Sequence, residues 1–236
     1  MGQTGDAAGD AKPSWAGAPT GLSPYLTLAE IGYLGQVVLI GANLVLLIAT
    51  AGVDYSGSVP SSVVETLLGL VISVAWFQVG RRVGNSWFLA AGISGAASVV
   101  LGMAVSSMPT VNPSEAYIVV AEMEGVVSLI FFIIGVVAFL SAARVFKVRL
   151  FRYAGYLLVV GFLVTFLAGM ADAIIAAPLA PCVPSSAGQS CLVQNGSVLV
   201  TYGLGYLVSA ATSLVAGIGF SRARGIAGTS ETSGTG

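Results

Sequence analysis

The stretch GVVSLIFFIIGVVAFLSAA, at residues 125–143, decides the fold class of this chain. It holds 19 residues without a charge, with Glu124 before it and Arg144 after it. A helix of that length rises about 1.5 Å per residue and nearly crosses the ~30 Å hydrocarbon core of a bilayer. The stretch therefore predicts a transmembrane helix rather than part of a soluble domain.

The composition of the whole chain agrees with that prediction. Of its 236 residues, 56% are apolar and only 8% are charged, whereas a soluble domain carries about 25% charged residues. The apolar runs are continuous, whereas a membrane β-barrel alternates polar and apolar residues over segments of about 10 residues. We therefore expect an all-α, polytopic helical transmembrane bundle.

Six apolar runs are each long enough for one crossing. They are residues 28–51, 61–80, 87–107, 117–143, 153–177 and 198–220. The two ends of the chain are polar and rich in small residues, which favours flexible tails. The predicted organisation is a tail at 1–24, a six-helix transmembrane domain at 25–222 and a second tail at 223–236, with short loops between the helices.

The basic residues predict the orientation of the helices. With six spans, every Lys and Arg falls on one side of the membrane: Lys12, Arg81, Arg82, Arg144, Lys147, Arg149, Arg152, Arg222 and Arg224. The positive-inside rule makes that side cytoplasmic. Both termini are then cytoplasmic in a multi-pass protein of the cell (plasma) membrane, and the loop at 178–197 is extracytoplasmic.

The same outer loop contains both cysteines of the chain, Cys182 and Cys191. Outside the reducing cytoplasm such a pair favours a disulfide. The alternative is two free thiols in a flexible loop.

Small residues recur at every fourth position in three of the spans. In the last span this seam includes Gly205, Ser209, Ser213 and Gly217. Small residues let helix backbones approach closely in a bilayer. We interpret the seams as packing surfaces within the chain or toward another subunit, and they favour a compact bundle without a large lumen. The alternative is the lining of a pore or a lipid-binding groove.

Carboxylates are the candidates for ion or proton binding. Only 15 uncharged residues, 66–80, separate Glu65 from Arg81, which is about 22 Å of helix and too short for the hydrocarbon core. Glu65 is therefore drawn into the outer leaflet, or the bilayer thins around it. We predict an ion or proton site at Glu65 with Glu122 or Asp172 contributing, and the alternative is that these residues only anchor helix ends.

Several classes of chemistry lack the residues they need. The chain has no histidine and two cysteines, and no motif for a nucleophile with its base, a phosphate loop or a metal site is present. We therefore expect no catalytic residue, no metal and no cofactor, and we expect that the chain is not an enzyme.

The leading functional hypothesis is a structural or accessory subunit without its own catalytic or redox centre. Its expected partners are the lipid bilayer and other membrane subunits or copies of itself, with no nucleic acid, because the few basic residues lie at membrane boundaries. The alternative is a small proton- or cation-coupled transporter or channel that uses carboxylates in the outer leaflet.

Overall fold

The computed structural model describes residues 21–49, 59–107, 115–176 and 196–232, and all of its regular structure is helical. The six helices are α1 (Ser23–Ala49), α2 (Val59–Val83), α3 (Ser86–Ser107), α4 (Glu115–Val145), α5 (Arg149–Ala176) and α6 (Gly196–Thr232). Each is long and apolar enough to cross a membrane. The predicted all-α class is confirmed, and so is the prediction of six helices with the length and apolar composition of membrane spans.

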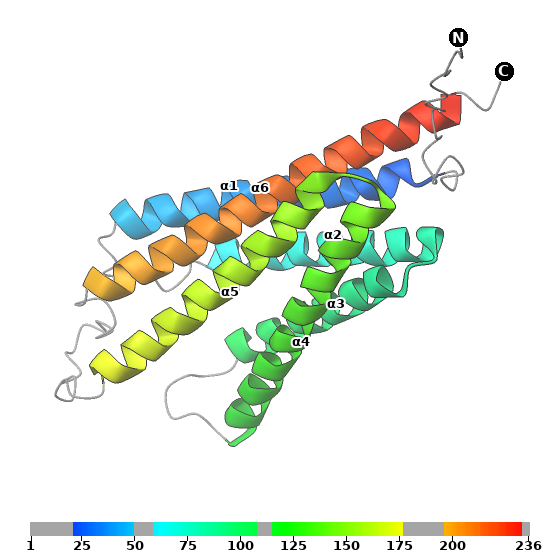
Figure 1. Cartoon of the computed structure of the whole chain (residues 1–236). Coiled ribbons are helices and arrows are strands. Elements are labelled where there is room, and N and C mark those ends of the chain that lie inside the picture. Colours follow the sequence, from blue (N-terminus) through cyan, green and yellow to red (C-terminus); the bar gives the residue numbers. More distant parts are fainter. Residues whose placement is uncertain (1–20, 50–58, 108–114, 177–195, 233–236) are drawn as a thin grey trace, which may run out of the picture.

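The six helices form a ring that follows the order of the chain (Figure 1). Each helix packs against the helices before and after it, and α6 closes the ring by packing against α1. Within the described ranges, no close backbone contact joins two helices that are not neighbours in this ring. The middle of the ring is therefore left to side chains.

Glycines bring neighbouring helices of the ring close together. A Cβ atom on Gly92 of α3 would lie 2.6 Å from the backbone nitrogen of Phe77 in α2, and one on Gly80 of α2 would lie 2.6 Å from the backbone nitrogen of Leu89. Real Cβ atoms do not approach backbone so closely. The α2–α3 hairpin therefore depends on the missing side chains at both glycines.

The turn of this hairpin is fixed by Gly84 and Asn85. Gly84 ends α2 with a φ of +68°, and the N–H of Asn85 donates a 3.0 Å hydrogen bond back to the carbonyl of Gly80, as in a Schellman cap. Oδ1 of Asn85 then accepts hydrogen bonds from the N–H groups of Trp87 (3.0 Å) and Phe88 (3.3 Å). One residue pair thus ends α2 and caps the start of α3.

Large aromatic side chains fill one end of the ring. Every helix contributes one of them and the turn between α4 and α5 adds Phe146, so the set is Tyr33, Trp76, Phe88, Phe139, Phe146, Phe151 and Phe220. The ring centroids of Trp76 lie 5.4 Å from Phe139 and 5.2 Å from Phe220, on helices that are not its neighbours. We call these seven buried side chains the aromatic plug.

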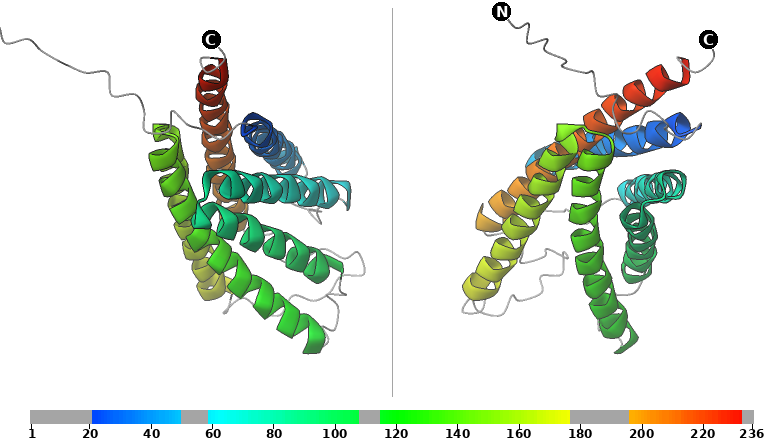
Figure 2. Two further views of the ribbon diagram at one scale, coloured as in Figure 1. Left: turned by 90° about the vertical axis from the view of Figure 1, so that its right-hand side faces the viewer. Right: turned by 45° about the vertical axis from the view of Figure 1, so that its right-hand side comes forward.

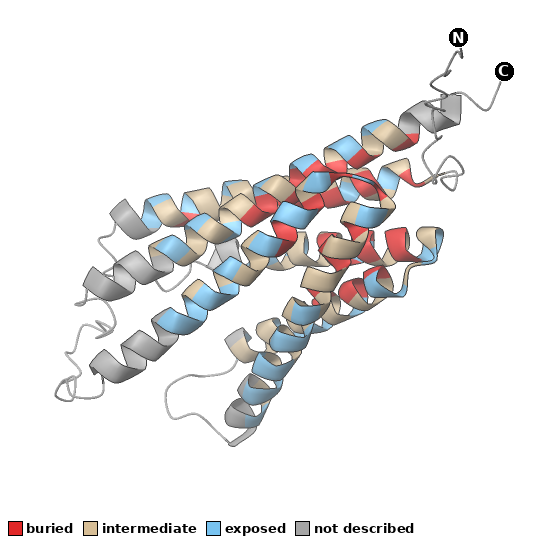
Figure 3. Ribbon diagram, viewed as in Figure 1, coloured by how far each residue is buried: buried red, intermediate tan, exposed pale blue. Residues whose placement is uncertain are grey.

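Burial is concentrated at this end of the molecule (Figure 3). The α2–α3 and α4–α5 turns, the start of α1 and the end of α6 all lie there, and they carry the basic residues of the described chain. We call this the basic end and the opposite end of the ring the open end. Figure 2 shows α4 and α5 side by side near their turn and diverging toward the open end.

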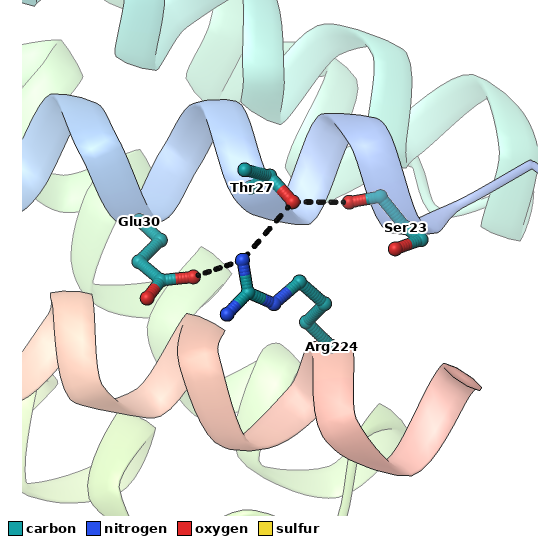
Figure 4. Close-up of polar contacts among 4 residues, drawn as sticks. All are labelled: Ser23, Thr27, Glu30 and Arg224. Carbon is teal, nitrogen blue, oxygen red and sulfur yellow. Dashed lines mark hydrogen bonds and ion pairs between the residues drawn. The ribbon is translucent and has the colours of Figure 1, made fainter. Parts of the chain in front are cut away.

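The end of α6 is held against α1 by an ion pair (Figure 4). Nη1 of Arg224 lies 3.1 Å from Oε2 of Glu30 and 3.4 Å from the hydroxyl oxygen of Thr27. Oε2 of Glu30 is buried and accepts no hydrogen bond, so its interaction with Arg224 is an ion pair only.

Helix α6 does not stop at 222, where the tail at 223–236 was predicted to begin. It continues to Thr232, and Ala223 and Ala227 are buried. These alanines and the Arg224 pair give residues 223–227 a packed face. A composition of small and polar residues does not reveal such a face.

Candidate functional site

A half-open cavity of about 700 Å³ lies in the ring and is lined by residues of all six helices. Its floor is formed by Tyr33, Trp76 and Phe139 of the aromatic plug. The predicted compact bundle without a large lumen is therefore wrong. Glycines and small residues draw ring neighbours together but not helices across the ring, and the aromatic side chains fill only the basic end.

One wall of the cavity is polar. Helices α1 and α6 supply two amides and five hydroxyl groups to the lining: Gln36, Asn43, Tyr33, Tyr206, Ser209, Thr212 and Ser213. The hydroxyl of Ser213 lies 3.2 Å from Oε1 of Gln36 and donates a hydrogen bond to it. Polar side chains within membrane helices are costly and usually functional, so this wall is the first candidate for a binding surface.

The wall formed by α4 and α5, which adjoins α6, is apolar apart from one threonine. Helices α4 and α5 line the cavity with Phe131, Phe132, Gly135, Leu157, Leu158, Gly161, Phe162 and Thr165. The hydroxyl of Thr165 donates to the carbonyl of Gly161 in its own helix. The cavity is therefore amphipathic, with amides and hydroxyls on one side and aromatic and aliphatic groups on the other.

Glu65 of α2 is the charged residue of the lining, and no Lys or Arg is among the described residues that form it. Glu65 precedes Trp76 by 11 residues on the same face of α2, about 16 Å along the helix axis. Its side chain is exposed. The carboxylate thus lies toward the open end, and the charge of the cavity favours a neutral or positively charged occupant.

Of the predicted carboxylates, the structure describes the side chains of Glu65 and Glu122 and does not bring these two together. Glu122 is exposed on α4 and does not line the cavity, and α2 and α4 are not ring neighbours. Asp172 belongs to α5, but its side chain lies outside the described residues. Glu65 is therefore the predicted carboxylate that the structure places at the cavity.

A second carboxylate reaches the cavity wall through hydroxyl groups. The hydroxyl of Ser128 donates a 2.7 Å hydrogen bond to Oε1 of Glu124, one helical turn away. It also lies 3.1 Å from the hydroxyl of Ser98 in α3, which lines the cavity. Glu124 is thereby connected to the lining, a link that the sequence reading missed because it treated Glu124 as a helix-end residue.

The seam of small residues on α6 has two environments. A Cβ on Gly217 would lie 2.9 Å from Cδ2 of Leu34 in α1, and a Cβ on Gly205 would lie 3.9 Å from the hydroxyl of Thr165 in α5. Ser209 and Ser213, between them, line the cavity. The stripe thus provides close helix contact at Gly217 and part of the polar wall farther along.

Cys182 and Cys191 lie outside the described residues, so the disulfide between them stays a prediction. Within the part of the chain that the structure describes, no group of three or more His, Cys, Asp or Glu side chains is placed to hold a metal ion. The cavity is suited to hold a molecule by shape, hydrogen bonds and a single charge.

The sequence contains a pattern that predicts the polar wall. Gln36 and Asn43 are seven residues apart in an otherwise apolar stretch, and seven residues return a helix to nearly the same face. Two amides on one face of a membrane helix indicate an inward, polar surface.

Comparison with known protein families, with curated proteins and with solved structures finds no match for this chain.

Proposed function

We propose that the chain is a multi-pass membrane carrier that binds a small molecule, neutral or positively charged, in the central cavity. The observation that carries the proposal is the half-open cavity of about 700 Å³ lined by all six helices. Ligand sites in proteins measure about 300–1,000 Å³ and combine an apolar lining with a few placed polar groups. In helical bundles they lie between the helices.

The distribution of charge supports a neutral or cationic ligand. Glu65 is the single charged side chain among the described lining residues, and the aromatic rings of Trp76 and Tyr33 form the floor. Aromatic faces attract cations, and a carboxylate attracts them more strongly. An anion would meet Glu65 without a compensating basic residue.

The aromatic plug supports a carrier rather than an open pore. Seven buried aromatic side chains fill the ring at the basic end, so a molecule in the cavity has no continuous path through the bundle in this conformation. Transport requires the plug to part, which is the behaviour of an alternating-access protein. With the orientation predicted from the basic residues, the cavity faces the outside of the cell membrane.

Identification of a bound molecule tests the proposal. Protein extracted in a mild detergent is denatured, and the released small molecules are measured by mass spectrometry against a cavity-filled variant, Ser209→Phe. Ala97→Phe, on an exposed position of α3 outside the lining, is the matched control. We expect a molecule that is enriched in wild type and in Ala97→Phe and lost from Ser209→Phe. Equal small-molecule content in all three proteins would contradict the proposal.

The accessory-subunit hypothesis stays a separate proposal, and it requires no occupant of the cavity. It predicts a stable protein partner, or a second copy of the chain, after mild extraction. A chain that elutes as a monomer together with a small molecule favours the carrier instead.

A further inference from the structure

The seam between α4 and α5 is closed toward the basic end and ends at one pair of rings. Near the turn, Gly155 of α5 lies against Phe139 and Leu140 of α4. Farther along, Phe132 and Phe162 stack with ring centroids 4.4 Å apart and an interplanar angle of 21°. Away from their turn the two helices diverge toward the open end (Figures 1 and 2).

The cavity reaches the seam at these rings. Phe132 and Phe162 both line it, and so does Thr165, one turn farther toward the open end. Phe162 is also 37% exposed, and Thr165 is exposed as well. Neighbouring helices therefore leave these side chains at the seam partly uncovered, and the surroundings of a membrane span are acyl chains.

The two walls of the cavity are arranged for a molecule that arrives through this seam. In the order of the ring α1 lies across from α4, so the amides of Gln36 and Asn43 on α1 lie across the cavity from the α4 side of the seam, whose own lining is mainly apolar. A polar group that passes between α4 and α5 meets hydrogen-bonding partners on the far wall, while an attached alkyl chain remains among apolar side chains and lipid.

We infer that the α4–α5 seam is a lateral entrance from the bilayer, with Phe132 and Phe162 as its closing pair. The ligand is an amphiphile with a neutral or cationic head that lies against the α1–α6 wall, while its alkyl chain passes between α4 and α5 into the lipid. The charge of the head follows from Glu65 and from the lack of Lys and Arg among the described lining residues. This inference rests on the proposed function and adds the class of ligand and its route.

Quenching of Trp76 fluorescence provides the readout, because Trp76 forms part of the cavity floor. Trp15→Phe and Trp87→Phe leave Trp76 as the sole tryptophan of a chain that has three. The probe is a hexadecyl dimethylammonium amphiphile whose head carries a nitroxide, added to proteoliposomes. The same probe with Ser209→Phe in this background measures quenching that does not depend on the cavity.

A cross-link tests the route. Cys182→Ser and Cys191→Ser remove the native thiols, and Phe132→Cys with Phe162→Cys allows a short bifunctional thiol reagent to join α4 to α5 before the probe is added. Gly35→Cys with Leu68→Cys is the matched control. A Cβ on Gly35 would lie 2.7 Å from Cδ2 of Leu68, so the reagent joins α1 to α2, and neither residue is in the lining.

We expect the cavity-dependent quenching to be lost in the α4–α5 cross-linked protein, retained in the α1–α2 cross-linked protein and restored when the reagent is released by reduction. Phe162→Ala, without any cross-link, should make quenching faster. Equal quenching with and without the α4–α5 cross-link would overturn the lateral route.

Two further outcomes separate the route from the function. If a trimethylammonium nitroxide without the alkyl chain quenches as strongly as the amphiphile, the cavity binds cations that enter from water, and the inference is wrong while the carrier stands. If neither probe quenches beyond the Ser209→Phe level, the inference is also wrong, and the carrier is judged by the mass spectrometric experiment alone.

Discussion

Nε1 of Trp76 in α2 donates a 2.9 Å hydrogen bond to the phenolic oxygen of Tyr33 in α1. Both side chains are buried, with 3% and 8% of their surface exposed, and both belong to the plug and to the cavity floor. This polar contact lies among stacked and edge-on rings, including Phe220, whose ring centroid is 5.6 Å from that of Tyr33. The bond orients the two rings that close the cavity.

Replacing the acceptor should destabilise the plug. In Tyr33→Phe, the indole N–H of Trp76 is left without its partner in a buried position. We expect a loss of between about 0.6 kcal/mol, the mean for hydrogen bonds between membrane helices, and about 3 kcal/mol, the upper cost of a buried unpaired donor. Unfolding by SDS in mixed micelles, followed by circular dichroism, measures it.

The control is a double-mutant cycle with Trp76→Phe. The double variant should lose less stability than the sum of the two single variants, since removal of both partners leaves no unpaired group. Additive losses would show that the hydrogen bond contributes nothing measurable.

Replacing either of two glycines on α3 with alanine should change the stability of the protein, in opposite directions at the two positions. A Cβ on Gly92 would lie 2.6 Å from the nitrogen of Phe77 and 2.7 Å from the carbonyl oxygen of Ser73, both of them backbone atoms, whereas a Cβ on Gly102 would have no atom within 4 Å. Gly92→Ala should therefore destabilise by about 1–3 kcal/mol through overpacking. Gly102→Ala should stabilise by up to about 1 kcal/mol through helix propensity. Matching effects of the two variants in the SDS titration would contradict the close α2–α3 approach.

Replacing one or the other partner of the ion pair between α1 and α6 should lower the stability by different amounts. The side chain of Glu30 is 15% exposed and that of Arg224 is 39% exposed. Arg224→Gln leaves the more buried carboxylate without its cation, while Glu30→Gln leaves an arginine that can reach water. We expect Arg224→Gln to cost about 1 kcal/mol, a moderate value because the pair is partly solvated, and Glu30→Gln to cost less. The thermal midpoint in detergent measures both losses. The double variant with Arg224→Gln and Glu30→Gln is the control, and its stability should recover relative to Arg224→Gln alone. A larger loss in Glu30→Gln would contradict this geometry.

The sequence predicts the helices well and their arrangement poorly, for a physical reason. The length of an uncharged run, such as the one between Glu124 and Arg144, is a local property of the sequence. Each span predicted from such a run is a helix. Whether small residues such as those at Gly205 and Gly217 bring together ring neighbours or opposite helices depends on the partner of each face. A stripe in one helix does not contain that information.

The same distinction applies to the site. Glu65 could be singled out from the short uncharged run after it, but its separation from Glu122 could not, because that depends on α2 and α4 being non-neighbours. The aromatic plug was also hidden. Six of its members are spread singly over the six apolar helices and the seventh, Phe146, lies in a turn, and a single aromatic residue at any of these places is unremarkable by itself.

The placement of the carboxylates predicts a difference between two conservative variants. Glu65 lines the cavity and Glu122 does not, so Glu65→Gln should reduce uptake of tetraethylammonium into proteoliposomes about tenfold. This corresponds to about 1.4 kcal/mol of lost attraction for a cation near one carboxylate. Glu122→Gln is the matched control and should leave uptake unchanged. Loss of uptake in Glu122→Gln alone would contradict the assignment of the cavity as the cation site.

Cysteine labelling tests the predicted outer loop and the orientation together. If Cys182 and Cys191 form a disulfide outside the cell, a membrane-impermeant maleimide added to intact cells should not label the chain until an impermeant reductant is added, after which two adducts should form. Ser86→Cys, at an exposed position of the basic end, provides the opposite-side control. It should be labelled only after the membrane is made permeable, because the positive-inside rule places that end in the cytoplasm. Labelling of the native cysteines before reduction would show that they are free thiols. Labelling of Ser86→Cys in intact cells would show that the orientation is the reverse of the predicted one, with the mouth of the cavity toward the cytoplasm.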